Sequence, residues 1–500
     1  MNERKFPWIE VSIILLAIVL RFAWLDIKPA HFDEGINGWF ADQMSRTGFY
    51  HYDPTNYHGP LHFYAVFVSQ TLFGRNLWAL RLPAIIASLL AVGLALRYHV
   101  FFGRTAARLA ALGLAVSTGA VFYGRYSIHE SWQLFFGMLM MYGVLGLWQF
   151  GTRRYLFSLV TAFVGLILTK ETYLLHAGSF VLAALTLWLW QKVIPSRPAL
   201  PVARQVWQRA DLVKASAVGV FAIVFFYSGT FLDWAGLKGL YETFAAWFKT
   251  GVEAAGHEKT SYELFHINYY WLYLLARYEF ATLIGLVAGL LYIGASDARV
   301  RFIAIYGGGV LVAYTLIPYK TPWCIISMLW PFLLIFGIVF SQRRWLPLAA
   351  ALILAISLAQ SIRLSFFHYT DEKEPYVYVQ TYPSIGELTT PLLSMAEKDP
   401  RYHEVRGQVL LDSYYPVPWI LGDFNQVAYY SKENQPSAID GDFVVIETSK
   451  AGDLEPRLKE NYYRRDFRLR DAQEQCTVYF RKALFEDWFK GAPPIVGPQP

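Results

Sequence analysis

Long apolar runs, separated by short polar segments, fill the first 363 residues of the chain. Most of these runs approach the roughly 20 apolar residues that an α-helix needs to cross a bilayer. We predict about eleven spans, over residues 9–27, 81–100, 106–123, 131–150, 156–169, 173–191, 213–232, 281–295, 302–318, 323–340 and 346–362. The pattern therefore predicts a mainly α-helical, polytopic membrane bundle over residues 1–363.

The first apolar run follows a charged start, MNERKFPW, and a signal peptide would begin in the same way. The run extends from about Ile9 to Leu25, which is long for the apolar core of a signal peptide, and no small-residue cleavage site follows it. We interpret it as an uncleaved first transmembrane helix.

Lysine and arginine predict the orientation of the bundle, because cytoplasmic loops are enriched in both. With a cytoplasmic N-terminus, alternation places five basic loops in the cytoplasm, at 97–108, 153–154, 192–214, 299–301 and 343–344. The opposite side receives segments richer in acids, at 28–80, 124–130, 170–172, 233–280 and 318–322. We therefore expect a multi-pass plasma membrane protein whose active site and C-terminal domain are extracytoplasmic.

Three segments of the predicted outer loops carry aromatic and apolar residues at helical spacing. They are residues 36–50, 61–78 and 240–255. This pattern is typical of helices that lie in the membrane interface. Loops packed on the bundle are the alternative interpretation.

The chain becomes far more polar after about residue 364. Short strand-like runs occur at 408–412, 426–430, 442–447 and 476–481, and a helical stretch covers 384–398. We predict a small extracytoplasmic α/β domain over residues 364–490. The last ten residues, GAPPIVGPQP, are predicted to be a disordered tail.

Composition supports a membrane protein, since 55% of the residues are hydrophobic and 16% are charged. Soluble domains usually carry about 25% charged residues. The formal net charge of +6 does not indicate nucleic acid, because the basic residues cluster in the predicted cytoplasmic loops. Two distant cysteines, Cys324 and Cys476, argue against a disulfide framework.

The motif HFDEG places Asp33 and Glu34 directly after the first span. Ionisable residues near a membrane are costly and usually mark a functional site. The pair could supply a general base, a metal ligand or both, with one carboxylate facing the reaction and the other anchoring the loop or a cation. Solvated loop acids are the alternative.

Three further motifs carry charge on the same predicted face. YGRYSIHES contains Arg125, His129 and Glu130; TKETY contains Lys170 and Glu171; IPYKTPW contains Lys320. Each also has a purely structural interpretation: local ion pairing, a snorkelling hairpin tip, or interfacial anchoring. Together they indicate a reaction on an anionic, lipid-linked substrate.

Two weaker signals concern a histidine pair and an arginine. In NYHGPLHFY, His58 and His62 stand at i and i+4, a spacing that can ligate a metal, but no HExxH motif supports it. Arg21 lies within the first span, either as a structural partner or as a phosphate contact. Neither signal decides a function.

The HFDEG motif after the first span, with its long amphipathic outer loop, resembles the GT-C class of membrane glycosyltransferases. That class includes protein O-mannosyltransferases and lipid A aminoarabinose transferases. With YHGPLHFY, GRYSIHES, TKETY, PYKTPW and DSYYPVPWILGDF, the chain looks similar to the flippase-activity-associated family of archaea and bacteria. It departs from that pattern at His129-Glu130, where an Asp and an Asn are expected.

The resemblance implies a lipid-phosphate-dependent hexosyltransferase that moves sugar, with inversion, from a polyprenyl-phosphate donor to a hydroxyl on a protein or glycolipid. Asp33 is the expected general base, and Glu34 and Glu130 orient it or hold a divalent metal ion; no cofactor is certain. The expected substrate-binding residues are His58, Arg125, His129, Lys170, Glu171 and Lys320. Partners are the lipid donor, membrane lipid and the acceptor. A non-catalytic lipid-linked-sugar binding or flippase-associated protein is the alternative.

Overall fold

The computed structural model describes residues 7–56, 58–194, 204–253, 257–294, 297–431, 434–470, 473 and 475–498. It divides into two compact units, each described here by itself. The helical unit comprises Met1–Leu25, Met44–Tyr369 and Glu374–Tyr376, and the C-terminal unit comprises Asp26–Gln43, Thr370–Lys373 and Val377–Pro500. The segment that carries Asp33 and Glu34 thus belongs to the C-terminal unit, although sequence alone assigned it to the bundle.

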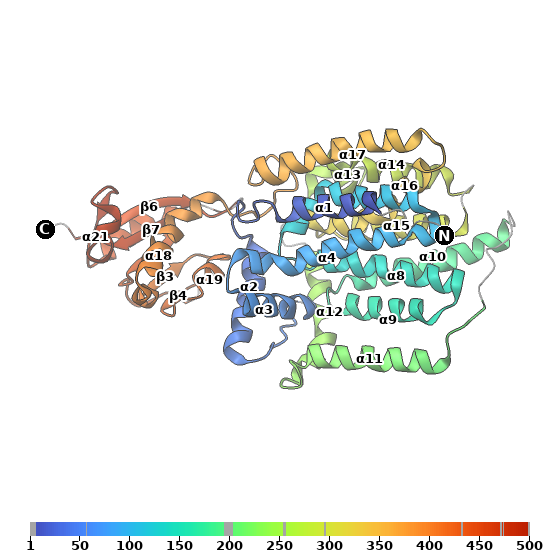
Figure 1. Cartoon of the computed structure of the whole chain (residues 1–500). Helices are drawn as coiled ribbons and strands as arrows, with labels where there is room; N and C mark the ends of the chain where they lie inside the picture. The colour runs from blue at the N-terminus through green and yellow to red at the C-terminus, as the bar shows by residue number, and fades with distance from the viewer. Residues whose placement is uncertain are drawn as a thin grey trace. The chain divides into compact units, whose positions relative to one another are not determined.

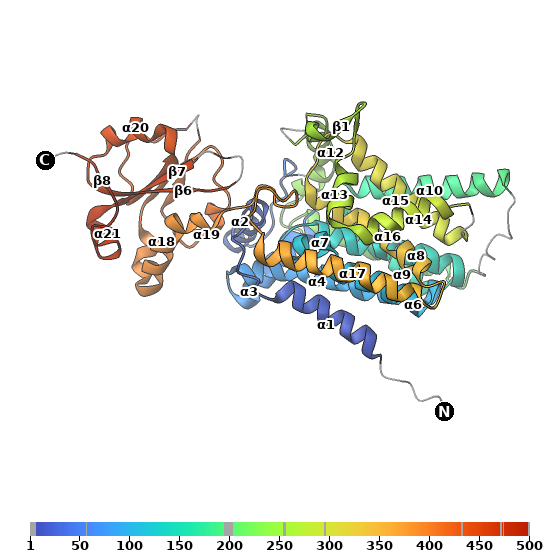
Figure 2. The same cartoon turned by 90° about the horizontal axis from the view of Figure 1, so that it is seen from above.

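The helical unit is built from long helices that run side by side (Figures 1 and 2). The α-helices of this unit, of which α5 and α7 have only four and five residues, are α1 (Trp8–Phe22), α3 (Leu61–Phe73), α4 (Leu77–Arg97), α5 (His99–Phe102), α6 (Arg104–Val116), α7 (Thr118–Phe122), α8 (Glu130–Phe150), α9 (Arg153–Ile167), α10 (Tyr173–Val193), α11 (Arg209–Tyr227), α12 (Ala235–Glu253), α13 (Tyr270–Tyr278), α14 (Phe280–Tyr292), α15 (Ala298–Leu316), α16 (Ile326–Phe340) and α17 (Leu346–Ile362). A two-stranded hairpin, β1 (Glu263–Leu264) and β2 (Ile267–Asn268), follows α12.

Among the described residues, seven helices are long and apolar enough to cross a membrane, and the bent pair α6–α7 would be an eighth. The predicted spans near 9–27, 156–169 and 281–295 coincide with α1, α9 and α14, which have 15, 15 and 13 residues. The prediction of a mainly helical, multi-pass membrane protein is confirmed. The count of eleven spans stays a prediction.

The bend between α6 and α7 has a specific cause at Ser117. The two helices meet there at 56°. Ser117 Oγ accepts a hydrogen bond from the Ala120 amide and donates one to the Glu279 carboxylate, which also accepts from the Gly119 amide at 2.6 Å. The amides at the start of α7 are therefore satisfied by side chains instead of by a continuous helix.

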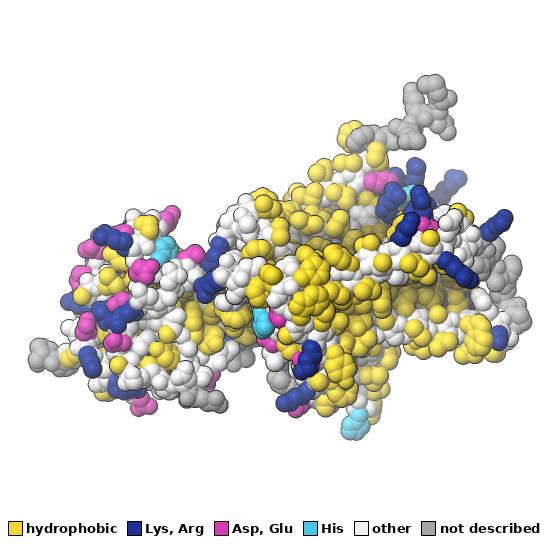
Figure 3. Space-filling model, turned by 90° about the horizontal axis from the view of Figure 1, so that it is seen from below, with side chains coloured by type: hydrophobic (Ala, Val, Ile, Leu, Met, Phe, Trp, Pro, Cys, Tyr) yellow, Lys and Arg dark blue, Asp and Glu magenta, His cyan; other side chains and the backbone are white. Residues whose placement is uncertain are grey.

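The surface of the helical unit matches its membrane assignment. Figure 3 shows hydrophobic side chains over the middle of this unit, with Lys and Arg side chains gathered at one end. Large apolar side chains are exposed there, for example Val218, Phe221, Leu291 and Leu348. Exposed apolar area on this scale requires a covering, which lipid supplies.

The C-terminal unit contains a six-stranded mixed sheet of order β4-β3-β5-β7-β6-β8. The strands are β3 (Gly407–Leu410), β4 (Val427–Tyr429), β5 (Phe443–Glu447), β6 (Tyr462–Arg468), β7 (Gln475–Arg481) and β8 (Ile495–Val496). β3 pairs in parallel with β4 and β5, and the other pairs are antiparallel. The four predicted strand-like runs correspond to β3, β4, β5 and β7, so the predicted α/β character is confirmed.

Helices cover both faces of this sheet, as Figure 2 shows. They are α18 (Gly386–Lys398), α19 (Val417–Ile420), α20 (Ala451–Leu454) and α21 (Lys482–Phe489). Alternate residues of each strand face opposite sides. Val409, Val445 and Val478 therefore pack with α18, α19 and α21, while Leu410, Val444 and Tyr479 pack with α20.

The C-terminal tail differs from its prediction. Residues 495–496 form β8 and pair with Tyr462 and Tyr463 of β6, so the predicted disorder of 491–500 is wrong at these positions. A sequence that is rich in proline and glycine gave no strand signal, and the pairing comes from the neighbouring strand. Residues 499–500 lie outside the described residues.

Candidate functional site

Helix α2 (Phe32–Thr47) begins with a reciprocal cap formed by His31 and Glu34. The Asp33 amide donates to His31 Nδ1 at 3.1 Å, and the His31 amide donates to Glu34 Oε2 at 2.8 Å. This is the capping-box arrangement, with histidine in the place usually taken by serine or threonine. The HFDE sequence therefore defines a helix start as well as a cluster of acids.

The cap separates the roles of the two adjacent carboxylates. Glu34 is fully buried and accepts the hydrogen bond that closes the cap. The Asp33 side chain is partly exposed, and its carboxylate accepts no hydrogen bond from any residue that the structure describes. A carboxylate in the first turn of a helix is also favoured by the helix dipole. Asp33 is thus the member of the pair that is available to a substrate.

The neutral form of His31 is required by its two contacts. Nδ1 accepts from the Asp33 amide, so Nε2 carries the proton and donates to the Tyr378 carbonyl at 2.9 Å. Burial lowers the pKa of His31, and the charge of Asp33 acts in the opposite sense. The ring is therefore held as the neutral tautomer that the cap needs.

The helical unit gathers the other predicted site residues into what we call the histidine–lysine cluster, which consists of His58, His62, His129, Glu130, Lys170 and Glu171. It forms where the loop before α3 runs alongside the turn between α9 and α10. The Gly59 amide donates to the Thr169 carbonyl at 3.1 Å, and the Leu61 amide donates to the Leu168 carbonyl at 2.9 Å. A Cβ on Gly59 would lie 2.4 Å from the Leu168 carbonyl carbon, so this approach requires glycine.

Two buried acid–base pairs organise the cluster. Lys170 Nζ forms an ion pair with Glu130 Oε1, and both side chains are less than one-tenth exposed. His58 Nδ1 lies 3.0 Å from Glu171 Oε2. Burial alone would lower the pKa of Lys170, but the charges of Glu130 and Glu171 outweigh it and raise this pKa above its ordinary value. Lys170 is therefore a permanent cation.

Three imidazole rings lie against one another beside this pair. The His129 ring centroid is 4.6 Å from that of His58 and 4.7 Å from that of His62. His62 Nε2 contacts Ser127 Oγ at 3.0 Å, whereas the buried His129 Nε2 has no hydrogen-bond partner among the described residues. Burial, together with the charges of His58 and His62, lowers the pKa of His129 well below its ordinary value. His129 is therefore a neutral ring beside a buried cation.

The described residues do not fit a metal ion at the positions expected to hold one. Glu34 closes the cap of α2, and Glu130 is paired with Lys170. Within the described part of the helical unit, the ligand atoms of His58, His62, His129 and Glu171 do not form a group of three within metal-binding distance. We therefore derive no catalytic step through a metal.

The Arg125 side chain is buried, and its contacts are structural. Its guanidinium donates to the carbonyls of Leu20, Ala23 and Trp24 at the end of α1, at 2.7 to 3.0 Å, and it is 2% exposed. Arg21 is similarly buried and donates to Ser88 Oγ at 2.8 Å and to the Leu114 carbonyl at 3.1 Å. Both arginines satisfy carbonyls at helix ends.

Lys320 also satisfies helix carbonyls. Its ammonium donates to the carbonyls of Tyr314, Thr315 and Ile317 at the end of α15. Burial lowers the pKa of Lys320 to about 8. Of the three cations expected to meet a phosphate, only Lys170 lies within a group of further ionisable side chains; Arg125 and Lys320 bind main-chain carbonyls.

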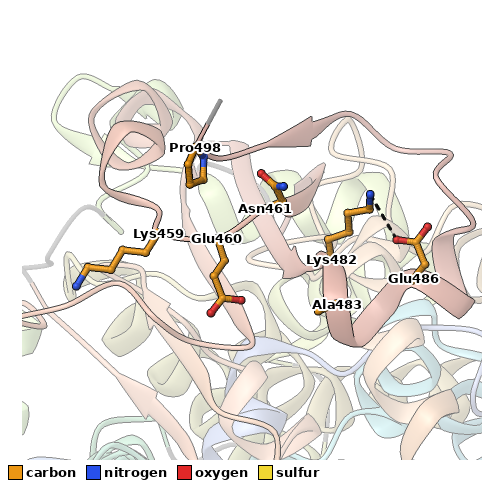
Figure 4. Close-up of a pocket in the computed structure, with 7 residues that line it drawn as sticks. All are labelled: Lys459, Glu460, Asn461, Lys482, Ala483, Glu486 and Pro498. Atoms are coloured by element: carbon orange, nitrogen blue, oxygen red, sulfur yellow. Dashed lines mark ion pairs between the residues drawn. The ribbon is translucent and has the colours of Figure 1, made fainter. Parts of the chain in front are cut away.

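An apolar groove adjoins the histidine–lysine cluster, and a separate polar pocket lies in the C-terminal unit. An apolar groove of about 510 Å³ begins at Leu61 and Leu168, directly beside the cluster, and continues between α8, α9 and α11 along Phe136, Val164 and Gly219. In the C-terminal unit, an open polar pocket is lined by Lys459, Glu460, Asn461, Lys482, Ala483, Glu486 and Pro498 (Figure 4). It contains none of the predicted site residues, and Lys482 pairs with Glu486 at its edge.

Sequence reasoning missed Arg470, a residue between β6 and β7 that stacks on Phe32, the first residue of α2. The Arg470 guanidinium carbon is 4.4 Å from the Phe32 ring centroid, and the side chain is 5% exposed. Its surroundings, RLRDAQ, resemble any charged strand end. No local signal marks it, because its partner lies more than 400 positions earlier in the chain.

Comparison with known proteins agrees with this architecture. Residues 57–203 match the family model PMT_2, described as dolichyl-phosphate-mannose-protein mannosyltransferase. No curated protein matches the chain in sequence. ArnT from Cupriavidus metallidurans is similar in structure, with a TM-score of 0.58 in the apo state and 0.60 when bound to undecaprenyl phosphate. Both alignments have 14% identity and cover 94% of this chain and 97% of ArnT.

The likeness to ArnT extends over nearly the whole chain, and the family match falls on the segment that contains the histidine–lysine cluster. The chain therefore has a fold similar to that of ArnT, and its residues 57–203 match the family model described as dolichyl-phosphate-mannose-protein mannosyltransferase.

Proposed function

We propose that the protein is a glycosyltransferase that moves a sugar from a polyprenyl-phosphate donor to an acceptor hydroxyl on a protein or glycolipid. The reaction takes place on the extracytoplasmic face with inversion, and Asp33 is the general base. The observation that carries the proposal is the division of labour in the Asp-Glu pair. Glu34 closes the cap of α2, and the Asp33 carboxylate remains without a hydrogen bond among the described residues.

A general base is what the acceptor requires. A hydroxyl is a poor nucleophile at neutral pH, and a positioned carboxylate that takes its proton contributes about 10²–10⁴-fold to the rate. Attack by the activated oxygen on the anomeric carbon, opposite the phosphate, inverts that carbon. The neutral His31 supports Asp33 by fixing the first turn of α2.

The leaving group is a phosphate, which gains negative charge as the glycosidic bond breaks. A fixed cation stabilises that charge in a site from which water is excluded. Lys170 is the candidate for this role, since Glu130 and Glu171 keep it protonated although it is buried. Arg125 and Lys320 are less suited, because main-chain carbonyls already bind their side chains.

The polyprenyl chain of the donor needs an apolar surface that leads to the phosphate. The groove between α8, α9 and α11 meets this requirement, because Leu61 and Leu168 at its end are hydrogen-bonded to each other and lie next in the chain to members of the histidine–lysine cluster. The ArnT structure bound to undecaprenyl phosphate supports a polyprenyl-phosphate partner for this fold.

The alternative is a non-catalytic protein that binds or helps to flip lipid-linked sugars. It is favoured by the same groove and by the buried Lys170, which would suffice for binding. It gives no role to Asp33. The two functions therefore differ in whether the Asp33 carboxylate is needed for product formation.

The test is transfer from a radiolabelled polyprenyl-phosphate sugar to an acceptor in membranes that contain the full-length protein. Asp33→Asn removes the base and is expected to abolish product while donor binding remains. Asp26→Asn is the matched control, because Asp26 is an exposed acid seven positions earlier in the same unit. Full transfer by Asp33→Asn would exclude Asp33 as the base. Donor binding by wild type without any transfer would favour the alternative.

A further inference from the structure

Helix α2 is packed closely, at two glycines, against the rest of the C-terminal unit to which its first turns belong. A Cβ on Gly35 would lie 2.4 Å from Pro416 Cα, and a Cβ on Gly38 would lie 2.3 Å from the Trp419 ring. Pro416 and Trp419 follow β3 at the carboxyl end of a strand that has parallel neighbours. This is the edge at which open α/β sheets usually hold their ligands. Here the edge holds the first turns of the helix that carries Asp33.

Arg470 connects that edge to the residue before Asp33. Its guanidinium donates to the carbonyls of Ser413 and Tyr415 and stacks over the Phe32 ring. Phe32 also meets the Tyr415 ring edge-on, with centroids 5.8 Å apart. A desolvated cation over an aromatic face is attracted to the π-electrons of the ring. Arg470 thus links the loop after β3 to the first residue of α2.

The segment that precedes α2 is attached to the same unit. His31 Nε2 donates to the Tyr378 carbonyl at 2.9 Å, and Gln380 Nε2 donates to the Pro29 carbonyl at 3.2 Å. Hydrogen bonds from His31 and Gln380 therefore fix the chain before α2. Arg470 contacts it at Phe32, and Pro416 and Trp419 contact it at Gly35 and Gly38.

Arg470 also acts on Asp33 through its charge. Burial lowers the pKa of Arg470 to about 10, and the charge of Asp33 opposes that shift. Opposite charges attract each other, so Arg470 also contributes electrostatically to the position of the Asp33 side chain.

We propose that the C-terminal unit is the positioning element of the transferase and that Arg470 is its positioning residue for the Asp33 carboxylate. This inference rests on the proposed function, since it presumes that Asp33 is the base. It gives the C-terminal unit a role in the chemical step, distinct from capping the protein or binding the acceptor.

The experiment compares Arg470→Gln, Arg470→Lys and the control Arg468→Gln in the full-length protein, with donor and acceptor concentrations varied. Arg468 ends β6 nearby, but it is half-exposed and pairs with Glu372. Arg470→Gln is expected to lower kcat by about 10²-fold, as expected for a misplaced catalytic group, with the donor KM unchanged. Arg470→Lys keeps a cation beside the Ser413 and Tyr415 carbonyls and should recover part of the lost kcat, and Arg468→Gln should change neither kcat nor KM.

Hydrogen exchange gives a readout that is independent of activity. In Arg470→Gln, amides of residues 31–43 should exchange faster while those of β5 and β7 stay protected. Should Arg470→Gln fail to fold, Gly38→Ala displaces α2 without removing a polar contact, and the same loss of kcat is expected.

The inference is overturned if residues 31–43 exchange as in wild type, if β5 and β7 lose protection to the same degree, or if kcat does not fall. Failure of the proposed function gives a different result. In that case Asp33→Asn transfers sugar at the wild-type rate, whatever the exchange of α2 in Arg470→Gln.

Discussion

Lys170 and Glu130 form a buried ion pair that joins the turn before α10 to the first residue of α8, 40 positions apart in sequence. Each side chain is less than one-tenth exposed, so neither charge is hydrated. The cluster therefore contains a positive charge, on Lys170, that the negative charge of Glu130 already balances. A donor phosphate that binds Lys170, as we propose, would therefore compete with the Glu130 carboxylate for the ammonium group or share it.

The first prediction concerns this pair. Removing one partner leaves an unpaired buried charge, which costs about 3–5 kcal/mol of stability. Lys170→Met and Glu130→Gln should each lower the unfolding midpoint strongly in a thermal melt of the detergent-solubilised protein, and the double variant should recover most of the loss. Transfer should stay absent in the double variant, because Lys170 is missing. A double variant that is as unstable as the sum of the two single ones would contradict the pairing.

The second prediction concerns the reach of the base. Asp33→Glu keeps the carboxylate but lengthens the side chain by one methylene, so the acceptor proton is approached from a displaced position. We expect kcat to fall by about 10²-fold, with hydrogen exchange of α2 unchanged. Single-turnover transfer measures the chemical step directly. Wild-type kcat in this variant would show that the position of the carboxylate is not critical.

The third prediction is a pH dependence at His31. Its pKa is lowered from 6.5 by burial, so the stability that the neutral ring contributes is present above pH 6.5 and is lost as the pH falls through the lowered value. The charged groups that face the ring are Asp33, Glu34 and Lys28. Protonation of Nδ1 removes the acceptor of the Asp33 amide, and α2 should then exchange faster in acid.

Hydrogen exchange of residues 31–43 at neutral and acidic pH measures this effect. His31→Asn is the matched control, because an asparagine side chain accepts the same amide bond but does not titrate in this range. Equal acid sensitivity in wild type and His31→Asn would assign the change to another group.

The fourth prediction concerns Lys320. Burial lowers its pKa from 10.5 to about 8, so the folded protein releases this proton before the unfolded chain does. Between pH 8 and 10.5 the unfolded state therefore binds more protons than the folded state. The stability contributed by Lys320 rises with pH in that window and is lost as the pH falls through 8. The difference in unfolding midpoint between wild type and Lys320→Met should change accordingly from pH 7.5 to pH 10. A constant difference would contradict the shift.

The fifth prediction concerns metal ions. Glu34 closes a helix cap and Glu130 is paired with Lys170, so neither carboxylate is available to a cation in this geometry. Transfer should therefore be unchanged after EDTA treatment. Loss of activity that Mg²⁺ or Mn²⁺ restores would contradict this prediction.

Much of the helical fold could be predicted from the sequence, because apolar runs depend on the local chain and the membrane. The HFDE spacing also contained the capping box, although histidine at its first position hid the signal. The cation roles could not be predicted. Arg125, Lys170 and Lys320 all stand in short polar turns, and only tertiary packing decides which one meets carbonyls and which one meets a carboxylate.

The placement of α2 also could not be predicted from the sequence. Its docking depends on Pro416, Trp419 and Arg470, which are nearly 400 or more positions away. β6 was missed for a different reason: YYRRDFR carries four charged residues, and their ion pairs with acids of other elements offset the cost of placing them in a strand.

β8 has a practical consequence for anyone who shortens this chain. Ile495 and Val496 cover the start of β6 with main-chain hydrogen bonds. Deleting the last ten residues would leave Tyr462 and Tyr463 with an open strand edge, and open edges promote pairing between molecules. A purification tag is therefore better added after Pro500 than substituted for the final residues.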